Sequence, residues 1–438
     1  MKTSTVIRTV GERIQRDGWA SAARSASRKA GELAGRRLAW DEPSLSLAAK
    51  DIHDAGPVPA QPGRTVDRLR VGIVCFPPSA GSGGHTTLFR MVRALEERGH
   101  HCTLVFYDPL AGDVDRHVPV IRRAWPDLDA DIASVDDGFG SYDAVVASSW
   151  ETAHVVASRN RTAMGFYFIQ DYEPFFFPHG YLYDLAESSY ALGLQNIALG
   201  GMVATEMRRQ RDLEPDLLVP FGCDTATYRL LESPEPRHGI VYYAKRTVDR
   251  RGYLLAKETL ERFHQLCPDQ PIHIVGDRVR GWDIPVEQHG SVPPAALNQL
   301  YNRTIASLAM SFTNVSLVPG ELLAAGNVPV LNDLPGPRLD LDSPDAVWVP
   351  GRPDALASAL AEVVRADAAS IVSRARRLAL RPRPSWAVAQ SMTADFIEDT
   401  VRRGTVPKPG EYRPPPVSAP PRSPSDRAGL RTPGREVS

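Results

Sequence analysis

Short runs of apolar, often β-branched residues alternate with amphipathic segments through the middle of this chain, and this alternation is what most constrains its fold. The run at 71–76 is followed by a glycine-rich turn, a segment with apolar residues at helical spacing that ends at Gly99, and a second run at 102–107. Strand, helix and strand in that order form a right-handed unit with parallel strands. Three further runs extend the same sheet, at 143–148, 164–170 and 196–201.

A second series of strands begins at 239–244. Its other strands are expected at 272–276, 306–310 and 328–331, with helices at about 253–266, about 295–303 and 321–326. Two separate sheets fit 438 residues better than one very large sheet. The sequence therefore predicts an α/β fold with two Rossmann-like parallel-sheet domains facing across a cleft, where ligands bind beyond the carboxyl ends of the strands.

Composition excludes several function classes. The 51 basic and 52 acidic residues give a net charge of -1, so we expect no nucleic-acid partner. The four cysteines form no CxxC pair, which predicts buried thiols and neither a zinc site nor a redox dithiol. No apolar run is long enough to span a membrane, and charges interrupt the amino terminus where a signal peptide would be apolar. These features predict a cytoplasmic protein.

Both ends of the chain differ from its middle. Residues 1–38 are basic, with Val6, Ile7, Val10 and Ile14 on one helical face, and a proline-containing linker follows, so 1–65 is interpreted as a helical extension. This helix could lie peripherally on an anionic membrane, although packing on the protein's own surface is favoured. Residues 404–438 are rich in proline and poor in large apolar side chains, which predicts a disordered tail.

The glycine cluster after the first strand predicts a ligand-binding turn. Gly83 and Gly84 allow a ligand to approach backbone amides at a helix amino terminus, so we interpret them, with His85, as an acceptor or phosphate loop. A tight turn without a ligand has equal weight. A nicotinamide enzyme remains a weak alternative, because Thr86 replaces the third glycine although Asp108 stands where the acidic residue is expected.

Five motifs in the second half together resemble family-4 retaining glycosyltransferases of the GT-B fold. They are FGCDTATY within 219–228, the basic stretch 244–252, IVGD at 274–277, HGSV at 289–292 and the segment 311–331. The resemblance covers about residues 69–400. It implies an acceptor domain at 66–225, a nucleotide-sugar donor domain at 226–385 and a helix at 386–403 that returns to the first domain.

The stretch QDYEPFFFPHG (170–180) is similar to a narrower branch that includes bacterial rhamnosyltransferases acting on surface glycans. The resemblance gives Asp171 a catalytic role near the acceptor or the donor sugar. Most relatives have His-Asp at this point, whereas this chain has Gln170 before the aspartate, so a histidine role is not carried over. By residue type alone, an aspartate after a strand is more often an Asx turn or a helix cap.

When the glycosidic bond of a nucleotide diphosphate sugar breaks, the negative charge on the diphosphate increases. A binding site for such a donor therefore needs fixed cations. Lys245, Arg246, Arg250 and Arg251 follow a strand and supply them. The family pattern G-R-x(4)-K-G matches Arg246 to Arg251 in spacing, while the branch aligns Lys245 with the first cation. Arg251 is therefore predicted as catalytic, and the other role is divided between Lys245 and Arg246. A solvated basic loop is the competing interpretation.

The segment NVSLVPGELL (314–323) predicts the rest of the donor site. Amides around Ser316 and Leu317 before a helix favour phosphate, and Glu321 in the first turn can accept hydrogen bonds from ribose hydroxyls. An ordinary dipole-stabilising glutamate is the alternative. By the resemblance, Gly290 lies in the nucleobase-side loop.

The family has a pair of glutamates, and the position of the first one is occupied in this chain by Thr313. The neutral hydroxyl of Thr313 cannot act as a carboxylate nucleophile. We therefore expect a front-face substitution, with Thr313 and Asn314 bonding the sugar's hydroxyls. Four DxD patterns occur among many aspartates without the context of a metal site, so neither a metal nor another cofactor is expected; they are 113–115, 127–129, 129–131 and 340–342.

Three functions compete. The first is a hexosyltransferase that moves a sugar, with rhamnose implied by the branch alone, to a bacterial glycan or lipid-linked acceptor. The second is a nucleotide-sugar epimerase, which needs no acceptor. The third is a catalytically silent sugar-nucleotide-binding protein, an alternative that Thr313 leaves open.

Overall fold

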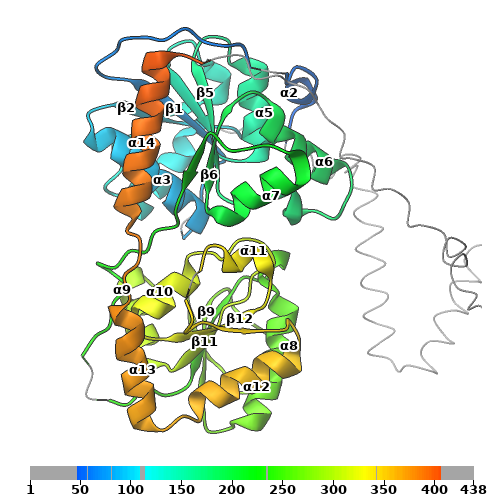
Figure 1. Cartoon of the computed structure of the whole chain (residues 1–438), viewed down its shortest axis with the longest axis vertical. Helices are drawn as coiled ribbons and strands as arrows, with labels where there is room; N and C mark the ends of the chain where they lie inside the picture. The colour runs from blue at the N-terminus through cyan, green and yellow to red at the C-terminus, as the bar shows by residue number, and fades with distance from the viewer. Residues whose placement is uncertain are drawn as a thin grey trace, which may run out of the picture. The chain divides into compact units, whose positions relative to one another are not determined.

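The computed structural model describes residues 47–405, apart from 57, 80, 109–113, 233–234 and 342. The expected basic helix at 1–38 lies outside the described residues, and so does the expected tail apart from its first two residues. The description below concerns the unit that begins at Ala49. Two parallel sheets with helices on both faces form its framework (Figure 1).

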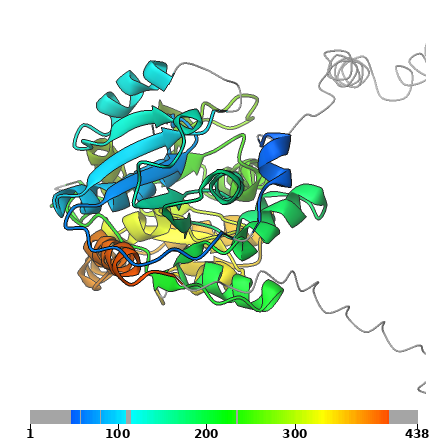
Figure 2. The ribbon, with the colours of Figure 1, turned by 90° about the horizontal axis from the view of Figure 1, so that it is seen from above.

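The first sheet has seven strands in the order β3-β2-β1-β4-β5-β6-β7, and in Figure 2 their colours run along the chain from blue at β1 to green at β7. The strands are β1 (Arg70–Cys75), β2 (His101–Phe106), β3 (Asp131–Ser134), β4 (Ala144–Ala147), β5 (Met164–Ile169), β6 (Gln195–Leu199) and β7 (Leu217–Val219). The central strands are apolar throughout because helices cover both of their faces. The helices are α2 (Ala49–His53), α3 (Gly83–Glu97), α4 (Val118–Ala124), α5 (Trp150–Arg159), α6 (Tyr181–Ser188) and α7 (Gly201–Arg211). Four short 3₁₀ helices are η1 (Val114–His117), η2 (Val135–Asp137), η3 (Glu173–Phe176) and η4 (Ser189–Ala191).

The second sheet has six strands in the order β10-β9-β8-β11-β12-β13. They are β8 (Ile240–Ala244), β9 (Ile272–Gly276), β10 (Glu287–Gly290), β11 (Ala306–Leu308), β12 (Val328–Asn332) and β13 (Val347–Val349). Helices α8 and α12 pack in one hydrophobic cluster of this sheet, to which α13 adds Leu378, and α9 packs in another; α10 contributes to both (Figure 1). The helices of this part of the chain are η5 (Asp249–Arg251), α8 (Tyr253–Leu266), α9 (Pro294–Arg303), α10 (Val318–Ala324), α11 (Pro335–Arg338), α12 (Pro353–Val364) and α13 (Ala368–Leu380).

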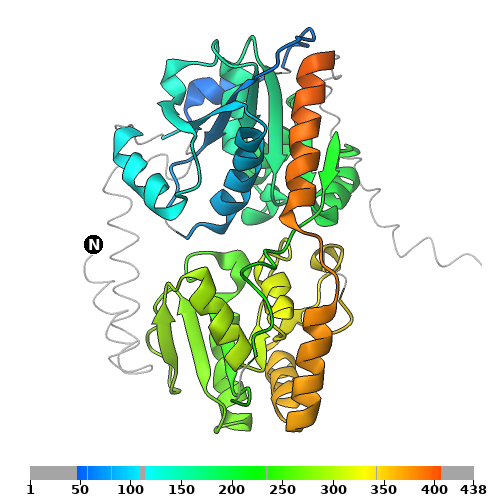
Figure 3. The ribbon, with the colours of Figure 1, turned by 90° about the vertical axis from the view of Figure 1, so that its left-hand side faces the viewer.

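The last helix, α14 (Trp386–Arg403), packs against the core of the first sheet beside α3 (Figure 3). Trp386, Ile397 and Val401 are buried in that core. The chain passes close to itself where it enters this helix, because a Cβ added to Gly222 would lie 2.6 Å from the backbone nitrogen of Trp386. A glycine is therefore needed at 222, within the motif that the sequence places before the crossing between the sheets.

The two-sheet α/β fold predicted from the sequence is confirmed, with some differences in detail. The helix expected at 321–326 begins earlier, at Val318, and HGSV begins within an edge strand, β10, rather than forming only a loop. Four short strands were not expected: β3, β7, β10 and β13. In the part of the chain that the structure describes, no helix combines the length and apolar character needed to cross a membrane.

Candidate functional site

The strand order of the second sheet reverses between β8 and β11, and the loops that leave these two strands contain the predicted donor residues. The strands are parallel neighbours, with Leu308 paired to Tyr242, so both loops leave the same edge of the sheet. The amide of Phe312 donates a hydrogen bond to the carbonyl of Arg250 at 2.9 Å and ties the loops together. A crevice beyond such a reversal is where α/β sheets bind ligands.

Arg251 lies between these two loops. Its guanidinium donates hydrogen bonds to Ser311 Oγ, to the carbonyl of Asn314 at 3.3 Å and to Asn314 Oδ1 at 3.2 Å. Burial lowers the pKa of Arg251 to about 10, and nearby Asp171 partly opposes this change. The guanidinium remains charged at neutral pH and is held in one orientation by neutral acceptors.

Asp171 comes from the first sheet, two residues after β5, and contacts the 311–314 loop of the second. Its Oδ2 accepts from Thr313 Oγ1 at 2.8 Å, and its Oδ1 accepts from the amide of Asn314 at 3.2 Å and from that of Tyr172 at 2.9 Å. Asn314 Nδ2 donates to the carbonyl of Gln170 at 2.8 Å. Burial raises the pKa of Asp171, while Arg251 and the hydrogen bond from Thr313 lower it. The structure therefore places three sequence-predicted residues in direct contact: Asp171, Thr313 and Asn314.

Arg250 is a partner of Asp171 to which the sequence gave no separate role. Its Nε lies 3.8 Å from Asp171 Oδ2, and its guanidinium stacks 4.0 Å from the centre of the Phe176 ring. Among the described residues, this buried Nε has no hydrogen-bond partner. A partly exposed guanidinium with an unused buried donor, beside a second guanidinium, suits an anionic ligand.

The position of Asp171 depends on buried hydrogen bonds in the turn that follows it. Glu173 accepts from the amide of Trp150 at 2.5 Å, at the amino terminus of α5, and from Tyr167 Oη at 3.1 Å. The Glu173 amide donates to the Tyr190 hydroxyl oxygen at 2.9 Å. Burial raises the pKa of Glu173 well above its usual range. Glu173 thus fixes the turn through hydrogen bonds and keeps Asp171 in place.

Ser316 and Leu317 lead into α10. Ser316 has a φ of 61°, a left-handed conformation that is strained for serine, and its amide donates to Asn314 Oδ1 at 3.2 Å. Leu317 packs against the hydrophobic core of the first sheet. Asn314, which also binds Arg251, therefore fixes the backbone at the start of the predicted phosphate segment; such strain persists where neighbouring contacts enforce it.

Glu321 lies in the first turn of α10, partly buried, in an unusual electrostatic environment. Burial raises its pKa to about 7, with Arg90 lowering it and Asp224 raising it. Arg90, from α3, lies 3.8 Å from Asp224 and stacks 5.0 Å from the centre of the Trp386 ring. Arg90 could not be recognised from the sequence, because an arginine within an amphipathic helix is normally exposed to solvent.

Lys245, Arg246 and Gly290 lie farther along the edge of the second sheet. The side chain of Arg246 is directed toward the carbonyl of Arg278 and the ring of Tyr253, with distances of 3.3 Å and 5.8 Å. Lys245 Nζ lies 5.2 Å from the centre of the Tyr243 ring. Gly290 ends β10 with a φ of 66°. The contacts of these three residues do not join the cluster of Asp171 and Arg251.

The glycine turn at the start of α3 lies next to the Asp171 segment. A Cβ on Gly84 would lie 3.8 Å from Gln170 Oε1, whereas one on Gly83 would meet nothing. His85 has both ring nitrogens engaged, Nε2 at 2.9 Å from the carbonyl of Phe76 and Nδ1 at 2.7 Å from Ser82 Oγ. Because a carbonyl only accepts, Nε2 carries the proton, and burial lowers the pKa of this neutral ring. His85 thus holds the turn together.

Aspartates of the DxD patterns that the structure describes form hydrogen bonds and ion pairs within the protein. Asp340 accepts from the amides of Gly201 and Met202 at the amino terminus of α7, at 2.5 Å and 3.2 Å, and burial raises its pKa to about 6. Asp127 forms an ion pair with Arg93. Residues 113 and 342 lie outside the described part. Asp108, the acidic residue of the nicotinamide alternative, forms ion pairs with Arg116 and His117.

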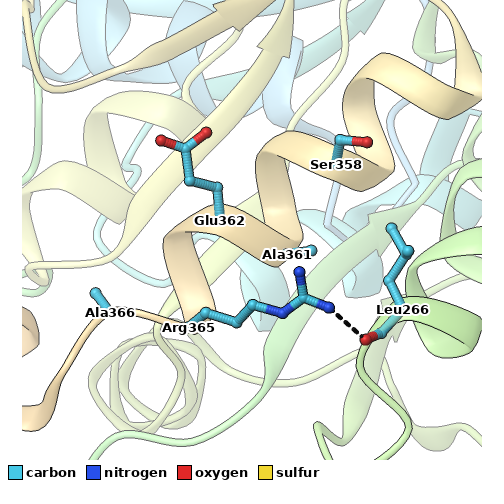
Figure 4. Close-up of a pocket in the computed structure, with 6 residues that line it drawn as sticks. All are labelled: Leu266, Ser358, Ala361, Glu362, Arg365 and Ala366. Carbon is cyan, nitrogen blue, oxygen red and sulfur yellow. Dashed lines mark hydrogen bonds between the residues drawn. The ribbon is translucent and has the colours of Figure 1, made fainter.

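A surface pocket of about 380 Å³ lies away from all these residues. It is lined by residues of α12 and by Leu266 at the end of α8, whose carbonyl accepts from Arg365 Nη2 at 2.7 Å (Figure 4). None of the sequence-predicted site residues lines it. Leu266 ends α8 directly before β9, so the pocket lies toward the amino end of that strand, and we assign no ligand to it.

No family model matches the chain. The O-antigen biosynthesis protein RfbC of Myxococcus xanthus is 27% identical over 292 residues, which cover 60% of this chain and 22% of that protein. The chain thus spans about a fifth of the length of the curated relative it matches.

Several solved structures share this fold, a glycosyltransferase among them. Anabaena HepE, determined in complex with UDP and glucose, has a TM-score of 0.56 at 14% identity and covers 75% of this chain and 99% of its own. A glycosyltransferase from Rickettsia africae has a TM-score of 0.53 at 13% identity and covers 77% and 100%. TarM has a TM-score of 0.57 at 10% identity and covers 74% and 97%. The chain has the GT-B fold, as expected from its sequence.

Proposed function

We propose that this chain is a glycosyltransferase that moves a sugar from a nucleotide diphosphate donor to a glycan or lipid-linked acceptor of the bacterial envelope. The GT-B fold and the O-antigen biosynthesis relative support the class and the setting. The observation that carries the proposal is the contact between Asp171, from the first sheet, and the loop that holds Arg251, at the strand-order reversal of the second.

The second sheet would hold the donor. Arg250 and Arg251 would supply two guanidinium groups to the diphosphate, next to the loop in which the Ser316 amide donates to Asn314 Oδ1. Ionised Glu321 would accept hydrogen bonds from the ribose hydroxyls. Lys245, or Arg246 after a rotamer change, would complete the set of cations, and Gly290 would allow the nucleobase to approach the backbone.

The first sheet would supply the acceptor side. Gly83 and Gly84 leave space beside Gln170, and Asp171 is the carboxylate nearest to the loop that would hold the sugar. HepE binds UDP-glucose, which supports a nucleotide sugar as the donor class. We propose rhamnose as the first sugar to test, on the resemblance of residues 170–180 alone. The cytoplasmic location and peripheral membrane contact expected from the sequence stay predictions.

A retaining front-face reaction fits the residues. Thr313 is neutral and donates its hydroxyl hydrogen to Asp171, so it offers no carboxylate nucleophile. The bond from the anomeric carbon to the phosphate oxygen would break as the bond to the acceptor oxygen forms on the same face, and the acceptor's proton would pass to the departing diphosphate. Arg250 and Arg251 would stabilise the charge that develops on this diphosphate without a metal.

The test is to incubate the full chain with a panel of nucleotide sugars, with and without envelope glycan acceptors, and to measure nucleoside diphosphate release and product. We expect product only when acceptor is present, with the donor's anomeric configuration retained and no loss in EDTA. Interconversion of sugar nucleotides without acceptor would indicate an epimerase. Saturable binding without turnover across the panel would indicate a silent binder. Either result would overturn the proposal.

A further inference from the structure

Three potential metal ligands converge on one face at the edge of the second sheet. His273 lies on β9, and Glu287 and His289 lie two residues apart on the edge strand β10. Glu287 pairs directly with His273 in the parallel ladder, so their side chains share a face, which His289 also reaches. The candidate ligand atoms of the three residues all lie within 4.8 Å of one another.

We propose that His273, Glu287 and His289 form a binding site for a divalent transition metal, with zinc as the best match. This site is independent of the proposed transferase reaction, in which no metal takes part. Two imidazoles and one carboxylate form a donor set that zinc uses in proteins, with a fourth position open to water. Calcium and magnesium are disfavoured because they prefer oxygen ligands.

The spacing of the donor atoms fits a tetrahedral ion. His273 Nδ1 lies 3.1 Å from His289 Nε2 and 3.2 Å from Glu287 Oε2. A tetrahedral zinc with bonds of about 2.0 to 2.1 Å separates its ligand atoms by about 3.3 to 3.4 Å. The two separations that involve His273 are therefore close to those of a zinc site, and the separation between Glu287 and His289 is within 4.8 Å.

Hydrogen bonding alone satisfies this group poorly. In the neutral ring, Nδ1 of His273 either carries one hydrogen or accepts one. If it carries the hydrogen, one donor is divided between the Glu287 oxygen and the His289 nitrogen. If it accepts from His289, its lone pair faces a carboxylate oxygen, which is repulsive. A cation placed between the three atoms would use one lone pair of each.

The three ligands differ in exposure. His273 is buried, so its ring is held in place by packing, whereas Glu287 and His289 lie at exposed positions from which an ion can enter.

A bulge in β10 is a second, independent feature of this site. The ladder register shifts between Gln288 and Gly290, which leaves His289 without a paired residue on β9. Bulges of this kind re-aim a side chain and are over-represented near functional sites. Because β10 is a short, exposed edge strand, a metal bound here would cross-link it to β9 and stabilise this edge of the sheet.

The test measures metal binding to the full chain without a purification tag. After EDTA treatment and its removal, zinc affinity is measured by competition with a chromogenic chelator, and cobalt is added as a spectroscopic probe. We expect one equivalent of zinc to bind with saturation, and cobalt to give the intense visible absorption of a tetrahedral site. His289→Ala and Glu287→Gln, both at exposed positions, should each weaken zinc binding at least about tenfold.

His101→Ala is the matched control. His101 Nε2 lies 3.1 Å from Asp131 Oδ2 across β2 and β3 of the other sheet, so this pair resembles the proposed site without its third ligand. The control should bind zinc as the unaltered chain does, and circular dichroism should show that all variants are folded. Absence of saturable binding, or equal affinity in the unaltered chain and both site variants, would overturn the proposal.

Discussion

Replacing Glu321 by glutamine should stabilise the fold at high pH and leave its stability unchanged at low pH. The pKa of Glu321 rises from the usual 4.5 to about 7 because its carboxyl is buried. A folded-state pKa above the unfolded value means that protonation favours folding. The contribution is therefore fully present below about pH 4.5 and is lost as the pH rises through 7.

The size of the effect follows from this change in pKa. One pKa unit corresponds to about 1.4 kcal/mol, so ionising Glu321 costs the fold about 3 kcal/mol at pH 8. Glu321→Gln keeps the shape and removes that cost. We expect its free energy of unfolding to exceed that of the unaltered chain by up to about 3 kcal/mol at pH 8, and to match it at pH 4.5.

Urea unfolding of the full chain at the two pH values, followed by tryptophan fluorescence, measures this difference. Glu362→Gln, on an exposed position of α12, controls for the loss of a carboxylate from the same domain. A Glu321→Gln variant that is equally stable or less stable than the unaltered chain at pH 8 would refute the burial argument.

Three further predictions concern activity and donor binding. The affinity for nucleoside diphosphate should rise as the pH passes through about 7, because Glu321 ionises there. Arg90 lowers the pKa of Glu321, so Arg90→Gln should move this rise in affinity to higher pH. Titration calorimetry from pH 6 to 8 would detect both effects. Arg251→Ala should lower kcat by about 100-fold or more. Arg208 is an exposed ion-pair residue on α7, so Arg208→Ala should leave kcat unchanged. Equal rates in the two variants would count against the diphosphate site. Asp171→Asn keeps the size of the side chain but removes the charge that faces Arg250. We expect kcat to fall more than about tenfold while the unfolding midpoint stays within a few degrees. A large drop in the unfolding midpoint would indicate a structural role alone.

The sheet architecture could be predicted because parallel strands covered on both faces are continuous apolar runs. The runs at 71–76 and 272–276 match β1 and β9 within one residue. The strands that were missed are short and lie at the sheet edges: β7 and β13 have three residues each, β3 begins at an aspartate, and β10 is a polar strand of four residues. A run of three residues gives no measurable periodicity.

The candidate site could be predicted only in part. Thr313, Asn314 and Asp171 come from motifs that the sequence showed, and the structure joins them through hydrogen bonds. The residues in contact are more than 140 positions apart in the sequence, and residue spacing cannot predict a contact at that separation. Arg90 near Glu321 was missed for the same reason.

The metal-ligand group was missed although part of its signal was visible. Glu287 and His289 are two residues apart on an exposed strand, which is the pattern of two ligands on one face. The third ligand, His273, is brought to them by the pairing of β9 with β10. Knowledge of that pairing was needed to recognise the group.

A crystal structure of the full chain with a bound nucleotide diphosphate sugar tests the central claim most directly. We predict that the diphosphate oxygens lie within hydrogen-bond distance of Arg250 and Arg251, with the ribose hydroxyls on Glu321. A diphosphate bound at another place, or a side chain filling the space beside these two arginines when the nucleotide sugar is present at saturating concentration, would contradict it.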